Sequence, residues 1–264
     1  MGLRDILKGR PGPLALDYQA FSDQGGRESN QDFYGAELDP ANGRYCFVLC
    51  DGLGGHRGGE TASRVAVDFV LAGFPFIYED NVAEGLANVF QAAHAAIRRQ
   101  AEADPKLKGM GATGVVLMIF GRNAFWGHVG DSRLYVIRKG QVVHQSRDHS
   151  VVQLLVDMGE IGPEEMPHHP DRNRLLKTLG ADDEIKPAFF VEGFPLESGD
   201  ILVLCSDGYW EYIKDGELVR TLTLDKAGPD FARRAARNFD TVKKRAKAAK
   251  EDCDNLTAQF IRVE

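Results

Sequence analysis

Several aspartates in this chain stand where apolar segments begin or end, so a rigid strand could hold each carboxylate in a fixed position. Asp32 and Asp254 precede apolar segments that read as strands. Three other apolar segments run into an aspartate, namely Val48-Leu49-Cys50 before Asp51, His128-Val129-Gly130 before Asp131, and Val203-Leu204-Cys205 before Ser206-Asp207. Because neighbouring antiparallel strands begin and end at the same edge of a sheet, these carboxylates can meet there.

A convergent set of carboxylates with no matching basic cluster predicts bound cations. Buried like charges raise one another's pKa unless a cation neutralises them. Oxygen ligands favour Mg²⁺ or Mn²⁺, whereas zinc prefers Cys and His. Taken singly, an Asp-Gly pair after a strand is more simply a turn. The recurrence of the pattern is what favours a metal site.

Two further features near these aspartates fit phosphate chemistry. A glycine-rich loop is predicted for residues 52–59, and it would let the carbonyl of Gly52 approach a metal. Arg27 lies five residues before Asp32, and its planar guanidinium can bind two phosphate oxygens at once. Alone, the glycines would indicate a flexible loop and Arg27 a surface charge.

The apolar pattern predicts the elements that must position these groups. The predicted strands cover residues 16–21, 33–38, 45–50, 113–120, 124–129, 134–137, 201–205 and 256–263. The predicted helices cover residues 62–70, 86–97, 150–158 and 230–250, where apolar residues recur at helical spacing. Blocks of strands separated by blocks of helices favour an α+β fold in which helices cover antiparallel sheets.

Length and composition set the expected domain organisation. The 264 residues suit one domain, predicted for residues 14–264, after an N-terminal tail of residues 1–13. Prolines and histidines between residues 160 and 185 favour a surface excursion over a core element. We therefore expect a flap at about residues 150–190, and a monomer by default.

Charge and cysteine usage narrow the partners and the compartment. The formal net charge of −7 argues against nucleic-acid binding, which needs an excess of Lys and Arg. The four cysteines lie mostly in apolar segments without a C-x-x-C spacing, which favours a reducing compartment and hence the cytoplasm. No uncharged apolar run of about 18 residues occurs, so no membrane association is expected.

Motifs spread over nearly the whole chain resemble one known family. They are SDQGGRESNQD, CDGLGGHRGGETAS, GATGVV, HVGDSRLYVIRKGQ, DHSVVQLLVDMG, HPDRNRLLKTLG, GDILVLCSDG and DNLTAQFI, in the order of the family. Together they resemble the PPM family, the protein phosphatase 2C-like metal-dependent phosphatases, in its bacterial form. The resemblance implies a four-layer α-β-β-α sandwich of two antiparallel sheets flanked by helix pairs.

The resemblance also implies the reaction and the roles of the residues. The reaction would be hydrolysis of phosphoserine and phosphothreonine in proteins by a metal-activated bridging water, opposing a Hanks-type serine/threonine kinase. Two Mn²⁺ or Mg²⁺ ions would be held by Asp32, Asp51, the carbonyl of Gly52, Asp207 and Asp254. Arg27 would bind the substrate phosphate, and Asp131 with Asp207 would support a weaker third ion.

The chain departs from the family pattern at three places. Leu53 stands where many eukaryotic members have a histidine proposed as the general acid, so the resemblance assigns no proton donor. Gln31 replaces a carboxylate that some relatives carry. Tyr209 and Trp210 follow the SDG motif where a smaller polar pair is usual, and we expect them either to line the approach of the substrate or to pack in the interior. The stretch SDGYWE resembles phosphatases attached to type VI secretion loci.

Two other classes of function compete with this interpretation. A catalytically weak regulator that only binds phosphoproteins would be expected to lose metal-binding aspartates, and this chain retains all of those named above. A metal-dependent nuclease could use the same carboxylates, but the net negative charge weighs against it.

Overall fold

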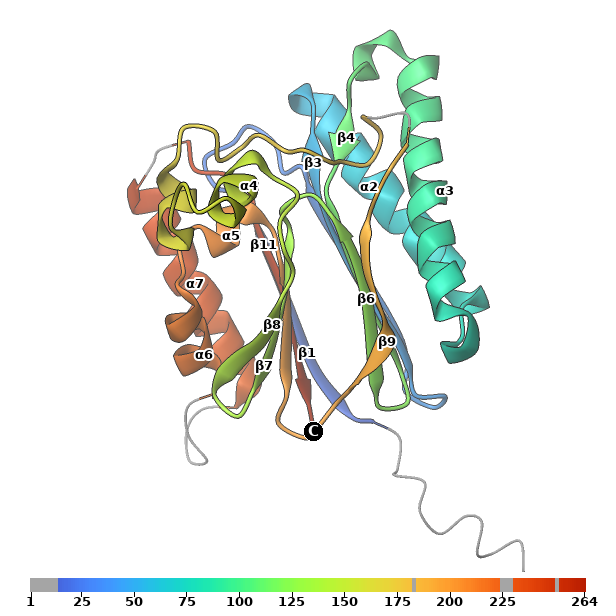
Figure 1. The fold of residues 1–264 in the computed structure, drawn as a ribbon, viewed down its shortest axis with the longest axis vertical. Helices are drawn as coiled ribbons and strands as arrows, with labels where there is room; N and C mark the ends of the chain where they lie inside the picture. The colour runs from blue at the N-terminus through green and yellow to red at the C-terminus, as the bar shows by residue number, and fades with distance from the viewer. Residues whose placement is uncertain (1–13, 182–183, 224–229, 250–251) are drawn as a thin grey trace, which may run out of the picture.

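Two antiparallel sheets pack face to face between two groups of helices (Figure 1). The structure is a computed structural model, and it describes residues 14–181, 184–223, 230–249 and 252–264. The tail predicted for residues 1–13 lies outside the described residues. The α+β class and the layered sandwich predicted from the sequence are confirmed.

The first sheet has the strand order β1-β11-β10-β7-β8. Its strands are β1 (Leu16–Asp23), β11 (Leu256–Val263), β10 (Ile201–Cys205), β7 (Arg133–Arg138) and β8 (Gln141–Gln145). The second sheet has the order β2-β3-β5-β6-β9, and β4 pairs with β3. Its strands are β2 (Asp32–Asp39), β3 (Arg44–Leu53), β4 (Gly111–Ala112), β5 (Gly114–Phe120), β6 (Asn123–Val129) and β9 (Ala188–Pro195).

Helices cover the outer face of each sheet. Helices α2 (Gly55–Gly73) and α3 (Val82–Ala103) lie on the second sheet, joined by the short 3₁₀ turns η1 (Phe74–Phe76) and η2 (Glu79–Asn81), and η3 (Pro105–Leu107) follows α3. Helices α5 (Asp207–Trp210), α6 (Asp215–Thr223) and α7 (Phe231–Ala249) lie on the first sheet. Between β8 and β9, the predicted flap region contains α4 (Val151–Asp157) and η4 (Pro163–His168).

Three apolar clusters hold these layers together. One lies between the sheets and includes Phe47, Leu117 and Leu204, while the other two lie between each sheet and its helices. Every residue of β5 and of β10 is buried, which explains their continuous apolar sequences. The central strands are therefore rigid supports for whatever their ends carry.

The strand directions bring the predicted site residues to one edge of the sandwich, the upper edge in Figure 1. Strand β2 begins at Asp32, whose register partner on β3 is Asp51. Strand β10 ends just before Ser206 and Asp207, and it pairs with β11, which begins just after Asp254 and Asn255. Because these neighbouring strands are antiparallel, the start of one strand lies beside the end of the next. The aspartates at these strand ends therefore meet at one edge, as predicted from the sequence.

The loop predicted for residues 52–59 is wrong at every residue except Gly54. Strand β3 continues to Leu53, and α2 begins at Gly55 after Gly54, whose φ is 106°. The first turn of α2 lies so close to the end of β3 that a Cβ on Gly52 would stand 2.1 Å from the carbonyl oxygen of Gly59. Glycine is needed here for close approach as well as for turning.

Several elements escaped the sequence prediction. Strands β8 and β9 and helix α6 were not predicted. The burial patterns of the two strands do not alternate regularly, so they lack the periodicity that marks a strand in the sequence. Ser150 was correctly predicted to cap α4, and its hydroxyl accepts a hydrogen bond from the amide of Gln153 at 3.2 Å.

No single helix in the described ranges is long and apolar enough to span a membrane. The pair Arg57–Phe76 and Glu79–Ala103, bent by 119°, reaches that length and composition only together.

Candidate metal centre

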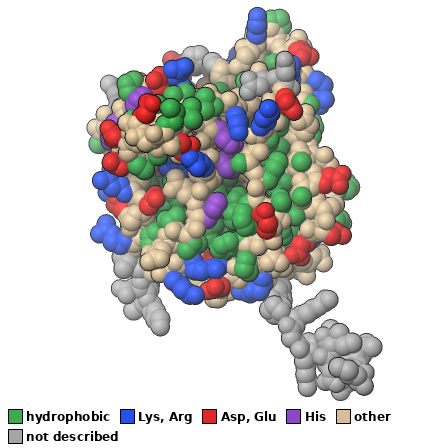
Figure 2. Space-filling view, viewed as in Figure 1, with side chains coloured by type: hydrophobic (Ala, Val, Ile, Leu, Met, Phe, Trp, Pro, Cys, Tyr) green, Lys and Arg blue, Asp and Glu red, His purple; other side chains and the backbone are tan. Residues whose placement is uncertain are grey.

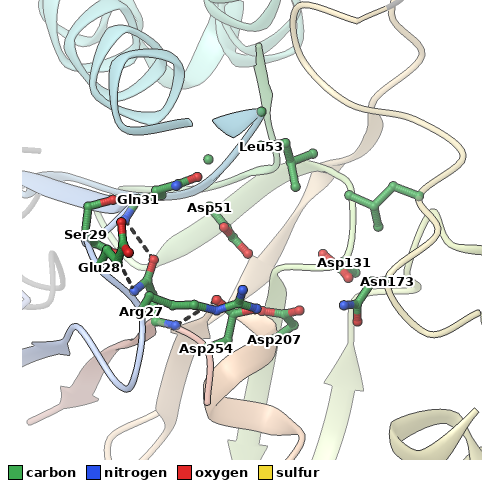
Figure 3. A pocket seen from close by; sticks show the side chains of 14 residues that line it. Arg27, Glu28, Ser29, Gln31, Asp51, Leu53, Asp131, Asn173, Asp207 and Asp254 are labelled. Atoms are coloured by element: carbon green, nitrogen blue, oxygen red, sulfur yellow. Dashed lines mark hydrogen bonds and ion pairs between the residues drawn. The ribbon is translucent and has the colours of Figure 1, made fainter. Parts of the chain in front are cut away.

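A pocket of about 380 Å³ opens at the edge where the strand ends meet (Figure 3). Its acidic lining consists of Asp51, Asp131, Asp207 and Asp254, with Glu28 at the side. The remaining lining residues are Arg27, Ser29, Gln31, Gly52, Leu53, Gly54, Asn173, Leu175 and Asn255. Residues from distant parts of the chain therefore surround one small volume.

Asp32 does not line this pocket, although its register partner Asp51 does. It is 6% exposed, and its Oδ2 accepts a hydrogen bond from the hydroxyl of Ser206 at 2.8 Å. Its Oδ1 is buried and has no hydrogen-bond partner among the described residues. A buried carboxylate oxygen without a donor is costly unless a cation or water reaches it. Asp32 lies directly beside Asp51, so its free carboxylate oxygen could act as a supporting ligand to a cation.

Burial and mutual repulsion disfavour the charged forms of these carboxyls. Burial, opposed by the Ser206 and Thr257 hydroxyls and reinforced by the negative charges of Asp207 and Asp254, raises the pKa of Asp32 to about 7. Burial and then the charge of Asp254 raise the pKa of Asp207 to about 7. Burial and the neighbouring aspartates also raise the pKa values of Asp51 and Asp131 well above the usual range.

This donor set fits hard divalent cations. The available ligands are carboxylates and the carbonyl of Gly52. A side chain at position 52 would clash with the backbone of Gly59 and so displace this carbonyl. In the described part of the chain, no three His, Cys, Asp or Glu side chains meet closely enough to hold an ion alone. Water and main-chain oxygens would complete each site, as is common for Mg²⁺. Cations here would remove the repulsion that raises the carboxyl pKa values.

Arg27 reaches the pocket from its exposed rim. Its Nη2 lies 2.7 Å from Oδ2 of Asp254, and the two side chains are 46% and 34% exposed. Figure 3 shows the guanidinium directed toward the aspartates. Because the pair is partly solvated, its contribution to stability is small. The sequence placed Arg27 at this site but did not predict its ion pair with Asp254.

Asn255 fixes the loop that carries Arg27, and sequence reasoning missed it. Its Nδ2 donates to the carbonyls of Gln24 and Ser29 at 2.8 and 3.0 Å. Its Oδ1 accepts from the amide of Gln31 at 2.8 Å. One buried side chain thus ties both ends of the arginine loop to the strand end that carries Asp254. The motif DNLT contained this signal.

Thr113 is a second supporting residue that the sequence did not single out. Its hydroxyl accepts from the amide of Asp51 at 2.9 Å and lies 2.7 Å from the hydroxyl of Ser132. It therefore connects the strand end that carries Asp51 to the loop that carries Asp131. The motif GATGVV was the available signal.

Part of the pocket wall is apolar, and it includes Leu53, the position at which the resemblance assigned no proton donor. Leu53 and Leu175 both line the pocket, and among the described lining residues none is a histidine. Gln31, another departure from the family pattern, borders the pocket beside Gly52.

The raised carboxyl pKa values predict a pH-dependent stabilisation by Mn²⁺. A carboxyl whose pKa is higher in the folded state costs stability as pH rises from about 4, its unfolded value, toward 7. A bound cation removes this cost, so Mn²⁺ should raise Tm more at pH 7.5 than at pH 5. Asp207→Asn should raise the Tm of the metal-free protein and reduce the Mn²⁺ effect. Thermal melts would check both, and an equal Mn²⁺ effect at both pH values would contradict this account.

Comparisons with known proteins identify the family. The protein phosphatase 2C family profile matches residues 23–251. Protein phosphatase PhpP of Streptococcus pneumoniae is 37% identical over 203 residues, which cover 75% of this chain and 80% of PhpP. The solved catalytic domain of PstP, in complex with two manganese ions, superposes with a TM-score of 0.80 at 29% identity and covers 95% of this chain and 99% of its own.

A third similar protein is PppA of Pseudomonas aeruginosa, described as a regulatory component of the type VI secretion system. It superposes with a TM-score of 0.75 at 27% identity, covering 94% of this chain and 98% of its own. The fold and the family motifs agree over almost all of the chain. The chain belongs to the protein phosphatase 2C family, in the bacterial form of these metal-dependent serine/threonine protein phosphatases.

Proposed function

We propose that this chain hydrolyses phosphoserine and phosphothreonine in proteins, with Asp32, Asp51, Asp207, Asp254 and the carbonyl of Gly52 holding two Mn²⁺ or Mg²⁺ ions. The observation that carries the proposal is the set of buried, mutually repelling carboxyls around one pocket with an arginine at its rim. When bound, such ions polarise phosphoryl oxygens and lower the pKa of water. The manganese-bound PstP structure supports this choice of metal.

The residues of the chain then have distinct tasks. Asp51 and Asp207 would supply negative charge to the ions, and Asp32 would support them from its place beside Asp51. With cations bound at Asp254, Arg27 would be free to contact the phosphate, and Asn255 would keep its loop in place. A guanidinium can hold two phosphoryl oxygens and orient the phosphorus for attack.

One assay separates this function from its rivals. Purified protein is incubated with a phosphothreonine peptide and, separately, with DNA, each with Mn²⁺ or with a chelator. We expect Mn²⁺-dependent release of phosphate and no cleavage of DNA. Peptide binding without turnover would instead support the phosphoprotein-binding regulator. Figure 2 favours the peptide over DNA, because Lys and Arg are interspersed with Asp and Glu on the face shown.

Asp131 is proposed to serve a third, weaker ion together with Asp207. Asp131→Ala should leave the first two Mn²⁺ sites occupied, weaken the third, and lower kcat for the phosphopeptide by about tenfold to a hundredfold. Calorimetric Mn²⁺ titration and steady-state kinetics would measure the two effects. Loss of all bound ions in this variant would contradict the division of roles.

Partners and location follow as further proposals. The substrates would be proteins phosphorylated by a cognate Hanks-type serine/threonine kinase, and the chain would act as a monomer. All four cysteines are free and buried, which agrees with the cytoplasm as a reducing compartment. The predicted association with type VI secretion has the likeness to PppA as its support, but PhpP and PstP share the same family without that description.

A further inference from the structure

Trp210 connects two of the aspartates through one turn of helix. It lies in α5, which begins at Asp207, so the two residues are three positions apart in the same turn. The indole is 6% exposed, and its Nε1 donates a hydrogen bond to the main-chain carbonyl of Asp131 at 2.9 Å. The element that carries one aspartate therefore holds the backbone of the other.

Arg133 fixes the face of this indole. Its Cζ lies 3.5 Å from the centre of the Trp210 ring. Its Nε and Nη2 donate to the two carboxylate oxygens of Asp148 at 2.9 and 2.7 Å, and its Nη1 donates to the hydroxyl of Tyr135 at 3.1 Å. A buried guanidinium with both edges bonded has little freedom to move. The ring of Trp210 thus stacks on a rigid plane.

The loop around Asp131 is also held from two other directions. Ser132 contacts Thr113, which bonds the amide of Asp51. The amide of His149 donates to the carbonyl of Gly130 at 2.8 Å, and the amide of Gly130 donates to Nδ1 of His149 at 3.3 Å. These contacts tie the loop to β3 and to the base of the predicted flap, whereas the Trp210 bond ties it to α5. Each tie fixes the loop relative to a different part of the pocket.

We propose that Trp210 is a positioning residue that holds Asp131 opposite Asp207, so that this turn of α5 sets the spacing of the donor pair for the third cation. The inference rests on the proposed function, because the spacing matters only if the two carboxylates share an ion. A phenyl ring could fill the space but could not donate the hydrogen bond.

The test is a Mn²⁺ titration of Trp210→Phe by calorimetry. The variant keeps an aromatic face against Arg133 and loses only the N–H donor. We expect the third-site Kd to rise roughly threefold to tenfold, the net effect of one hydrogen bond, with the two tight sites unchanged. With phosphopeptide, kcat should fall at limiting Mn²⁺ and recover in excess Mn²⁺, while KM stays the same.

Tyr209→Phe is the matched control. Tyr209 is a buried aromatic neighbour whose hydroxyl bonds Asn238 on α7 rather than the Asp131 loop. Its loss should lower Tm and leave the Mn²⁺ titration unchanged. If both variants weakened the third site equally, Trp210 would be acting through the general stability of α5, and the proposal would fail.

A double-mutant cycle isolates the route through Asp131. In an Asp131→Ala background, Trp210→Phe should have no further effect on the Mn²⁺ dependence of kcat. An additive effect, or a third-site Kd for Trp210→Phe equal to that of the unaltered protein, would overturn the proposal. Should Trp210→Phe fail to fold, benzothienylalanine at position 210 replaces the N–H by sulfur at nearly the same shape and carries the same expectations.

The same titration distinguishes this inference from the proposed function. Asp207→Ala should lose tight Mn²⁺ binding whatever Trp210 does. If Asp207→Ala kept its tight sites, the metal centre itself would be wrong; if it lost them while Trp210→Phe titrated like the unaltered protein, only the positioning role would be wrong.

Discussion

Asp207→Ala is expected to abolish Mn²⁺-dependent hydrolysis of a phosphothreonine peptide, with a loss of kcat of about a thousandfold or more. In addition to burial, the negative charge of Asp207 raises the pKa values of Asp32, Asp51 and Asp131, and the charge of Asp254 raises the pKa of Asp207 itself. In the proposed arrangement, removing Asp207 would take a donor from both the core ions and the third ion. Steady-state kinetics across a Mn²⁺ series would measure the loss.

Asp68→Ala is a suitable control for that experiment. Asp68 is an exposed carboxylate on α2, away from the pocket lining, so its loss should change neither kcat nor metal binding. Near-normal turnover by Asp207→Ala, at any Mn²⁺ concentration, would remove the central assignment. A variant that is inactive but still binds two Mn²⁺ tightly would show instead that Asp207 acts on the substrate rather than on the metal.

Arg27→Ala is expected to lower kcat/KM for the phosphopeptide by about tenfold to a hundredfold, the range for losing charge-assisted hydrogen bonds to a phosphate. Mn²⁺ binding should persist or become slightly tighter, because Asp254 loses the cation that now pairs with it at 2.7 Å. Arg27→Lys should recover only part of the activity, since an ammonium group cannot hold two phosphoryl oxygens in the planar arrangement.

Inorganic phosphate gives an independent readout of the same role. As the product, it should inhibit Arg27→Ala more weakly than the unaltered protein, by a factor similar to the change in kcat/KM. Arg220→Ala removes an exposed arginine of α6, away from the pocket lining, and should leave both quantities unchanged. Equal inhibition by phosphate in Arg27→Ala and the unaltered protein would show that Arg27 does not contact the phosphoryl group.

Much of the fold and of the candidate site could be predicted from the sequence because both depend on local patterns. A strand buried on both faces must be continuously apolar, so β5 and β10 were recognisable from their residues alone. Strand ends require turn residues, so the aspartates could be placed at one edge before any contact was known. Strands β8 and β9 are half-exposed and were missed, whereas the other two edge strands, β1 and β2, were predicted.

What the sequence alone determined was therefore the family, the layered sandwich, and the identity of the acidic residues and of Arg27 at its edge. Only the tertiary structure decided that Asp32 lies beside Asp51, that Arg27 pairs with Asp254, that Asn255 anchors the arginine loop, and that Trp210 holds the carbonyl of Asp131. These are contacts between residues far apart in the chain. Their geometry depends on how strands and helices pack, and no local periodicity encodes it.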